Sequence, residues 1–286
     1  MRRGGWRWRR AALLLGVALT AAGLGYLAYR SHLLRRPEQQ AIDTRYQIRG
    51  AQPHNTARIV VVAIDDASIQ RLGELGLHNH FPFPYRYTAR VIDRLHRAGA
   101  KLIVLDTQIT EKEGVVDNVA LLEAIDNARP MILLTSLVDA GRTNLLGGDE
   151  ELREVGARAG DNQFRADTDG AIRSTQYAIR GLRTAGVVIA EVDTGRAVSP
   201  SLFGGTKTLV PIDYSGPPGT VRWIPYSRVY EGRFPRALVA GKIVVVGTTA
   251  PTLGDVHQAA LGGGAPMPGP ESEIVSAMAF ASSWTA

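Results

Sequence analysis

The chain has 286 residues, of which 45% are apolar, and it carries a formal net charge of +6. It contains no cysteine, which excludes disulfide-stapled folds and cysteine-based metal sites. The charge is uneven, because residues 1–36 hold eight arginines and no acid, which leaves 25 basic against 27 acidic residues in the rest. The body therefore offers no global positive field, and we expect no nucleic-acid partner.

The N-terminal segment predicts a membrane anchor. A basic tail, residues 1–10, precedes an uncharged stretch over residues 11–29. As a helix this stretch spans about 28 Å, close to the hydrocarbon thickness of a bilayer. Five arginines precede it and three follow, which favours a single pass through the inner (plasma) membrane with a cytoplasmic N-terminus and an extracytoplasmic body. The alternative is a cleaved signal peptide, although the apolar stretch continues to Leu27.

Residues 30–57 are predicted as a juxtamembrane linker with a short helix over Glu38–Arg49, and residues 58–280 as one folded domain. Unbroken β-branched runs in this domain are typical of strands that are covered on both faces of a parallel sheet. The strongest runs are IVVVA (59–63), KLIVLD (101–106) and KIVVVG (242–247), with a weaker one in PMILLTSLV (130–138).

Helices are predicted between the first three strands, over 67–75, 85–99 and 117–128, with Asp66 as the cap of the first. The expected core faces are Ala89, Ile92, Leu95 and His96 in the second helix, and Val119, Leu122 and Ile125 in the third. This alternation predicts an α/β fold with a central, mostly parallel sheet flanked by helices.

The later part of the chain predicts shorter elements. Asp-Gly at 169–170 before an alternating run predicts a hairpin inserted in the domain. Residues 149–158 are expected to form a surface helix or loop, and 185–192 fit a strand or a helix. A short strand is expected at 208–212, helical turns at 226–232 and 235–240, and a helix from Pro270, with 281–286 as a truncated end.

Polar side chains follow three of the predicted strands. Asp65, Asp66 and Asp106 follow two of them and Thr248 a third, at the edge where open α/β sheets bind ligands. We therefore predict a site for a cation or a small polar ligand there, with Arg86 at its mouth. The structural alternative is that Asp66 caps a helix, Asp106 holds a loop and Arg86 forms a salt bridge.

No catalytic residue, cofactor or resident metal is expected. The six histidines are scattered, whereas a zinc site needs three or four converging ligands. Asp167-x-Asp169-Gly170 is similar to a calcium loop, but Gln176 stands where the loop needs its final acid.

Several landmarks taken together resemble a known family. They are RIVVVAIDDASIQRLG, FPFPYRYTARVIDRLHRAGAKLIVLD, DTDGAIRS, IDYSGPPGT, YSRVYEGRFP, GKIVVVGTTAPTLGD and a later MPG. Their order over about residues 40–280 is similar to the extracytoplasmic CHASE sensor domain, type two. The resemblance implies a sensor domain after one membrane helix, with a cyclase or kinase as the usual output. The sequence after Asp255 departs from the family pattern.

We therefore expect a membrane-anchored extracytoplasmic sensor of a signal-transduction receptor. It would bind an unknown small ligand, would not be an enzyme, and would lack an output domain of its own, so that a cyclase or kinase would act as partner. The sequence also leaves open whether the protein forms a homodimer. The alternatives are a metal-dependent envelope hydrolase that uses Asp65, Asp66 and Asp106, and a degenerate receptor fragment that serves as an interaction module.

Overall fold

The computed structural model describes residues 4–30, 35–52, 57–110, 114–217, 219–253, 256–259 and 267–268. Its helices are α1 (Gly4–Arg30), α2 (Arg35–Arg49), α3 (Asp66–Glu74), α4 (Tyr85–Arg97), α5 (Val115–Asn127), α6 (Asp149–Glu154), α7 (Ala185–Thr194) and α8 (Tyr226–Glu231). Short 3-10 turns are η2 (Leu145–Gly147), η3 (Pro200–Phe203), η4 (Arg236–Leu238) and η5 (Pro251–Leu253).

The strands form one large sheet, a second sheet and two small hairpins. The large sheet holds β1 (Ile59–Ile64), β2 (Leu102–Asp106), β3 (Met131–Thr135), β6 (Ala157–Asp161), β12 (Arg222–Pro225) and β13 (Ile243–Thr248). The second holds β7 (Arg165–Ala166), β8 (Ala171–Thr175), β11 (Val210–Pro211), β14 (Val256–Ala259) and β15 (Met267–Pro268). The hairpins are β4 (Val138–Asp139) with β5 (Arg142–Thr143), and β9 (Ala178–Ile179) with β10 (Leu182–Arg183).

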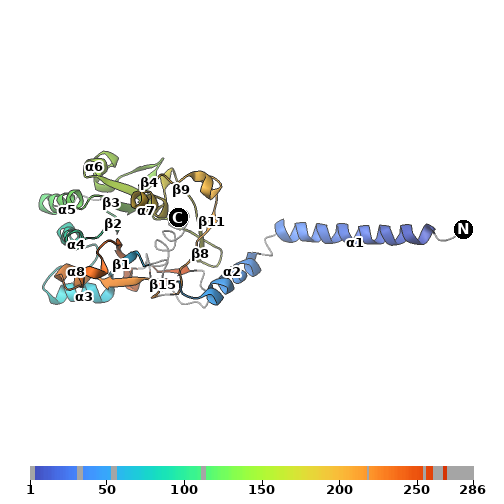
Figure 1. The fold of residues 1–286 in the computed structure, drawn as a ribbon, viewed down its shortest axis with the longest axis horizontal. Coiled ribbons are helices and arrows are strands. Elements are labelled where there is room, and N and C mark those ends of the chain that lie inside the picture. Colours follow the sequence, from blue (N-terminus) through green and yellow to red (C-terminus); the bar gives the residue numbers. More distant parts are fainter. Residues whose placement is uncertain are drawn as a thin grey trace.

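The large sheet is parallel throughout, in the order β12-β1-β13-β2-β3-β6. Figure 1 shows β1, β2 and β3 one after another across the body. Of the strands in this sheet, β13 comes last in the sequence, yet it lies between β1 and β2. All four strands predicted from apolar runs lie next to one another at its centre, which confirms the predicted α/β class with a mostly parallel sheet.

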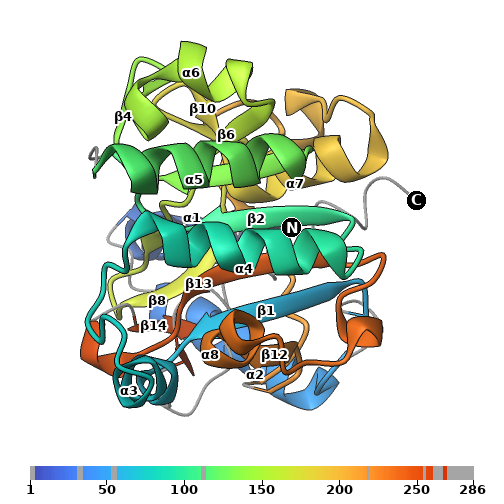
Figure 2. The same ribbon diagram turned by 90° about the vertical axis from the view of Figure 1, so that its left-hand side faces the viewer.

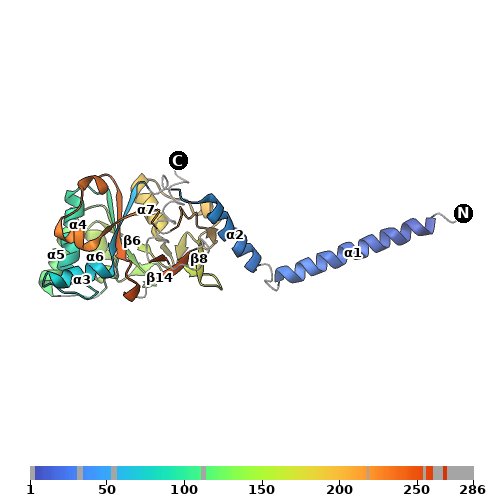
Figure 3. The same cartoon turned by 90° about the horizontal axis from the view of Figure 1, so that it is seen from below.

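Both faces of this sheet are buried. Alternate side chains separate cleanly, since Val60, Val62 and Ile64 face one core whereas Ile59, Val61 and Ala63 face the other. The first core is closed by α3, α4, α5 and α8, with α4 and α5 side by side across the sheet (Figure 2). The second is closed by α7, and Figure 3 shows α7, β8 and α2 on the side opposite α3 to α6.

The predicted hairpin is confirmed. Strands β7 and β8 pair antiparallel around the turn at residues 167–170, with a bulge between Arg165 and Ala166. Strand β11, predicted as 208–212, pairs antiparallel with Thr175 and Ser174 of β8. This second sheet carries a small core of Ile172, Ile212 and Tyr214, against which Tyr46 of α2 packs.

Helix α1 projects from the body and joins it through α2 (Figure 1). Within α1, Trp8–Leu27 is apolar and long enough to cross a membrane. Its leucines are exposed, Leu13 and Leu14 by 69% each, so no apolar surface from the described residues covers this helix. An exposed apolar helix of this length is suited to the hydrocarbon interior of a membrane.

Several local predictions were wrong. Strands β6 and β12 were not predicted, because ARAGD and RWIP are not apolar runs. The surface helix or loop expected over 149–158 is helix α6 (Asp149–Glu154), although the last two residues of that range belong to β6. Helix α5 buries Leu121, Ala124 and Ile125, while Val119 is 46% exposed. His96 is exposed, since α4 presents Val91, Ile92 and Leu95 to the core. The ambiguous segment at 185–192 is helix α7. The helix expected from Pro270 and the end at 281–286 lie outside the described residues.

Leu95→Ala tests the core under α4. Leu95 is 0% exposed, so its truncation should lower the free energy of unfolding by about 2–5 kcal/mol. Urea unfolding in detergent micelles, followed by tryptophan fluorescence, measures the change. Arg97→Ala, on the exposed side of the same helix, is the control and should change stability by less than about 0.5 kcal/mol. Equal losses in both variants would contradict the assigned face.

Candidate functional site

The carboxyl ends of the central strands meet at one edge of the sheet. In the strand register Ile64 is opposite Thr248, and Gly247 is opposite Asp106. Asp65 and Asp66 come directly after Ile64. The structure therefore places these predicted residues along the ends of β1, β13 and β2.

Each aspartate at this edge has a partner within the protein. Asp65 caps α3 by accepting a hydrogen bond from the backbone N of Ser68 at 2.9 Å, so the cap predicted for Asp66 belongs to Asp65. Asp66 is instead the first helical residue and accepts from the hydroxyl of Thr252. Asp106 accepts from Nδ2 of Asn162 at 2.8 Å, and Thr248 is buried.

Arg86 lies apart from these aspartates, in the first turn of α4. Its guanidinium forms an ion pair with Asp117 of α5 at 2.8 Å, and its backbone N donates to the same carboxylate at 3.1 Å. The Asp117 hydrogen bond raises the pKa of Arg86. The structure thus shows Arg86 joining two helices, and a role in ligand binding stays a prediction for all five residues.

Sequence reasoning missed the polar groups at the end of β6. Asp161 is 0% exposed; its Oδ1 accepts from the backbone N of Gln163 at 2.7 Å, and its Oδ2 has no hydrogen-bond partner. The Oδ1 of Asn162 is also buried without a partner. Burial raises the pKa of Asp161 to about 6. These residues were missed because β6 itself was missed.

A second polar centre joins α2 to the hairpin. The guanidinium of Arg173 on β8 is 7% exposed and makes five hydrogen bonds of 2.8–2.9 Å, all to carboxylates. Two go to Asp43 of α2, two to Asp169 and one to Asp167. The Asp43 hydrogen bonds are the largest cause of a raised Arg173 pKa, and the Arg173 hydrogen bond lowers the pKa of Asp169. We call these four residues the Arg173 cluster.

The second half of α2 continues this junction. The ring of Tyr46 lies edge-on to that of Tyr214 with centroids 5.9 Å apart, and its hydroxyl donates to the carbonyl of Ile212. Arg49 pairs with Asp213, and the backbone N of Gln52 donates to the carbonyl of Ser215 at 2.6 Å. Apolar, charged and backbone contacts thus hold α2 on the body from Asp43 to Gln52.

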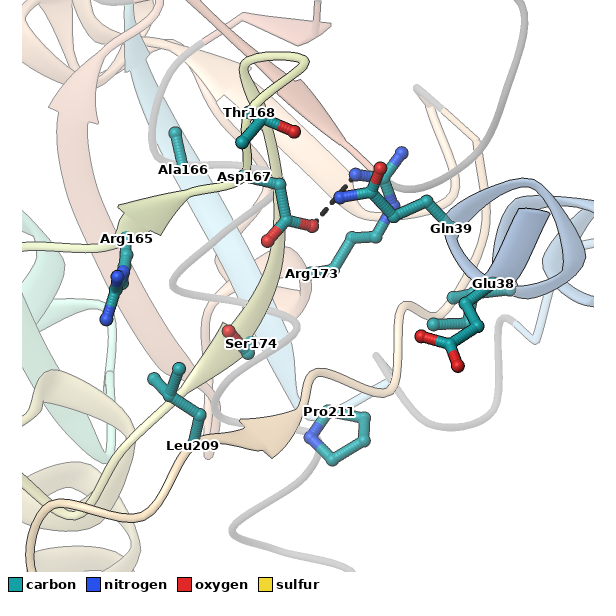
Figure 4. Close-up of a pocket in the computed structure, with 11 residues that line it drawn as sticks. Glu38, Gln39, Arg165, Ala166, Asp167, Thr168, Arg173, Ser174, Leu209 and Pro211 are labelled. Carbon is teal, nitrogen blue, oxygen red and sulfur yellow. Dashed lines mark hydrogen bonds and ion pairs between the residues drawn. The ribbon is translucent and has the colours of Figure 1, made fainter. Parts of the chain in front are cut away.

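A cavity of about 430 Å³ lies beneath the first half of α2 (Figure 4). Its walls come from α2, from the β7–β8 hairpin and from the segment that contains β11. They are lined by Glu38, Gln39, Ile42, Arg165, Ala166, Asp167, Thr168, Arg173, Ser174, Leu209 and Pro211. A second cavity of about 380 Å³ lies at the amino ends of β1 and β12. Both are away from the edge where the sequence predicted a pocket.

Within the described ranges, no group of three or more His, Asp or Glu side chains is placed to hold a metal ion. The three aspartates of the hydrolase alternative have the internal partners given above.

Asp161→Asn tests the buried carboxyl. The folded state holds the Asp161 proton up to about pH 6, whereas the unfolded chain releases it near pH 3.8, so the free energy of unfolding falls between these values. The free energy of unfolding of the variant does not fall in this way. The difference in this free energy, variant minus native chain, should therefore rise by about 2–3 kcal/mol from pH 4 to pH 7. Urea unfolding across this range measures it. Asp139→Asn, at an exposed carboxyl, should give no such rise; an unchanged difference for Asp161→Asn would contradict the assignment.

The sequence of the chain matches a protein-family model. A model of the CHASE2 domain matches residues 12–281, from within α1 through the whole large sheet. No curated protein and no solved structure matches the chain. Because the family match covers nearly the whole chain, the chain belongs to the CHASE2 domain family of extracytoplasmic sensor domains.

Proposed function

We propose that this protein is a single-pass membrane sensor whose body binds a small ligand outside the cytoplasm and reports binding to the membrane through α2. The observation that carries the proposal is the Arg173 cluster, which joins the helix next to the membrane to a strand of the sensor body. A cyclase or kinase as the output, implied by the family resemblance, is part of the proposal.

The orientation is supported by the charges around α1. Five arginines lie before the apolar stretch and three after it, and the side with more arginines is usually cytoplasmic. This orientation puts α2 and the large sheet together on the extracytoplasmic side.

The Arg173 cluster allows α2 to be either docked on the body or released from it. One guanidinium faces three carboxylates, and two of these, Asp167 and Asp169, belong to its own hairpin. If α2 moves away with Asp43, Arg173 keeps two charged partners and is not left unpaired in a buried site. Leaving a buried charge unpaired is the main cost of breaking such pairs. The docked and released states of α2 can therefore lie close in free energy, so that a ligand can shift their populations.

Topology can be tested cleanly because the chain has no cysteine. Glu123→Cys places one thiol on the exposed side of α5, and Arg9→Cys places one before the apolar stretch. In spheroplasts, a membrane-impermeant maleimide should label Glu123→Cys, whereas Arg9→Cys should react only after lysis. The reverse pattern would contradict the proposed orientation.

The two-state contact predicts different outcomes for the two sides of the Arg173–Asp43 pair. Spin labels at Gln40→Cys on α2 and Lys207→Cys on the body report their separation by electron paramagnetic resonance. Asp43→Asn should broaden the distance distribution and leave the melting temperature of the body nearly unchanged. Arg173→Met should broaden it and also lower the melting temperature, because it leaves the hairpin carboxylates without their cation.

Arg45→Gln is the matched control, since Arg45 is an exposed charged residue on the same helix outside both the Arg173 cluster and the cavity lining. It should leave the distance distribution as it is in the native chain. An unchanged distribution in Asp43→Asn would show that the cluster does not hold α2 on the body.

A further inference from the structure

We propose that the cavity beneath the first half of α2 binds a small zwitterion, a molecule with an ammonium group and a carboxylate group joined by a short carbon chain. This inference rests on the proposed function, since it names the ligand class that the sensor detects and the place where it binds. The site differs from the strand-end edge predicted from the sequence.

The size and the walls of the cavity are those of a small-molecule site. Its volume of about 430 Å³ falls within the range of about 300–1,000 Å³ that is typical of such sites. Ile42 of α2 and Leu209 and Pro211 of the body supply apolar walls. The remaining walls are polar, with Gln39, Thr168 and Ser174 as uncharged hydrogen-bonding groups.

The charged side chains of the cavity that can still bind a ligand include both a cation and anions. Arg173 already forms ion pairs with three carboxylates, so it offers little attraction to a ligand anion. Arg165 is exposed, and no ion pair or side-chain hydrogen bond is found for it among the described residues. Glu38 is likewise exposed without such a partner in the described part of the chain, and only Oδ2 of Asp167 accepts from Arg173. One guanidinium and two carboxylates therefore face the cavity with hydrogen-bonding capacity left.

Their arrangement separates the two signs of charge. Figure 4 shows Arg165 and Glu38 on opposite sides, with Ser174 and Asp167 between them. A ligand carboxylate fits against Arg165, and an ammonium group fits against Glu38 and Asp167. A plain dianion would leave the two carboxylates of the site unmatched, and a plain diamine would leave the guanidinium unmatched.

The same contacts connect binding to the membrane helix. Glu38, Gln39 and Ile42 belong to α2, whereas the other lining residues belong to the body. A ligand that touches both has a higher affinity for the docked position of α2 than for a released one. It therefore shifts the population towards the docked state.

The test is isothermal titration calorimetry on the full chain in lipid nanodiscs. The probes are the proteinogenic amino acids and a matched four-carbon series of 4-aminobutyrate, butane-1,4-diamine and succinate. We expect at least one zwitterion to bind with a Kd of about 1 mM or tighter, and the diamine and the dianion to bind at least about tenfold more weakly. For that zwitterion, Arg165→Glu and Glu38→Arg should each weaken binding about tenfold or more.

The double variant carrying Arg165→Glu and Glu38→Arg should regain affinity, because a zwitterion can bind in the reversed direction. Arg196→Glu, at an exposed position outside the cavity, is the control for net charge and should bind as the native chain does. Melting curves of each variant show that a loss of binding is not a loss of fold.

Three results would overturn the proposal: no zwitterion binds, the diamine or succinate binds as tightly, or binding is indifferent to the changes at Arg165 and Glu38. The spin-label pair on α2 separates this failure from that of the proposed function. A zwitterion that binds and leaves the α2 distance unchanged supports the site and contradicts the signalling route. Loss of α2 docking in Asp43→Asn together with no zwitterion binding supports the route and contradicts the site.

Discussion

The apolar character of both faces of the parallel sheet determines where the rest of the molecule can lie. Neighbouring residues of β1, such as Val61 and Val62, enter different cores, so each face needs its own cover. Helices α3, α4, α5 and α8 cover one face, and α7 covers part of the other. The hairpin β7–β8 and β11 belong to the second sheet, which lies on the α7 side. Helix α2 packs against this sheet (Figure 3).

Much of this fold is predictable from the sequence because a doubly covered strand leaves an unbroken apolar run. The four strands found in this way, β1, β2, β3 and β13, lie next to one another at the centre of the sheet. Strands β6 and β12 form its two edges and have weaker runs, with Arg158 in β6 and Arg222 and Trp223 in β12. Trp223 is 46% exposed, so an edge strand can carry residues that resemble those of a loop.

The candidate sites were harder to predict for a different reason. That Asp65, Asp106 and Thr248 share one sheet edge follows from parallel topology, but their partners depend on loops such as the one that holds Asn162. The pair Asp43–Arg173 is separated by 130 positions. In the sequence Asp43 stands in a polar helix that is typical of a solvated linker, so nothing local marks it as a contact.

Two ion pairs of α2 in the described part of the chain differ in their contact with solvent. Arg173 and Asp43 are 7% and 18% exposed, whereas Arg49 and Asp213 are 35% and 42% exposed. Dissolved ions weaken attraction between exposed charges, with a screening distance of about 8 Å at physiological salt, and act much less on buried ones. An extracytoplasmic domain can meet media of widely different salt concentration, and high salt would weaken the Arg49–Asp213 pair more than the Arg173–Asp43 pair. The contact between α2 and the body thus has one end, at Arg49, that responds to the salt concentration of the medium, and another, at Arg173, that is shielded from it.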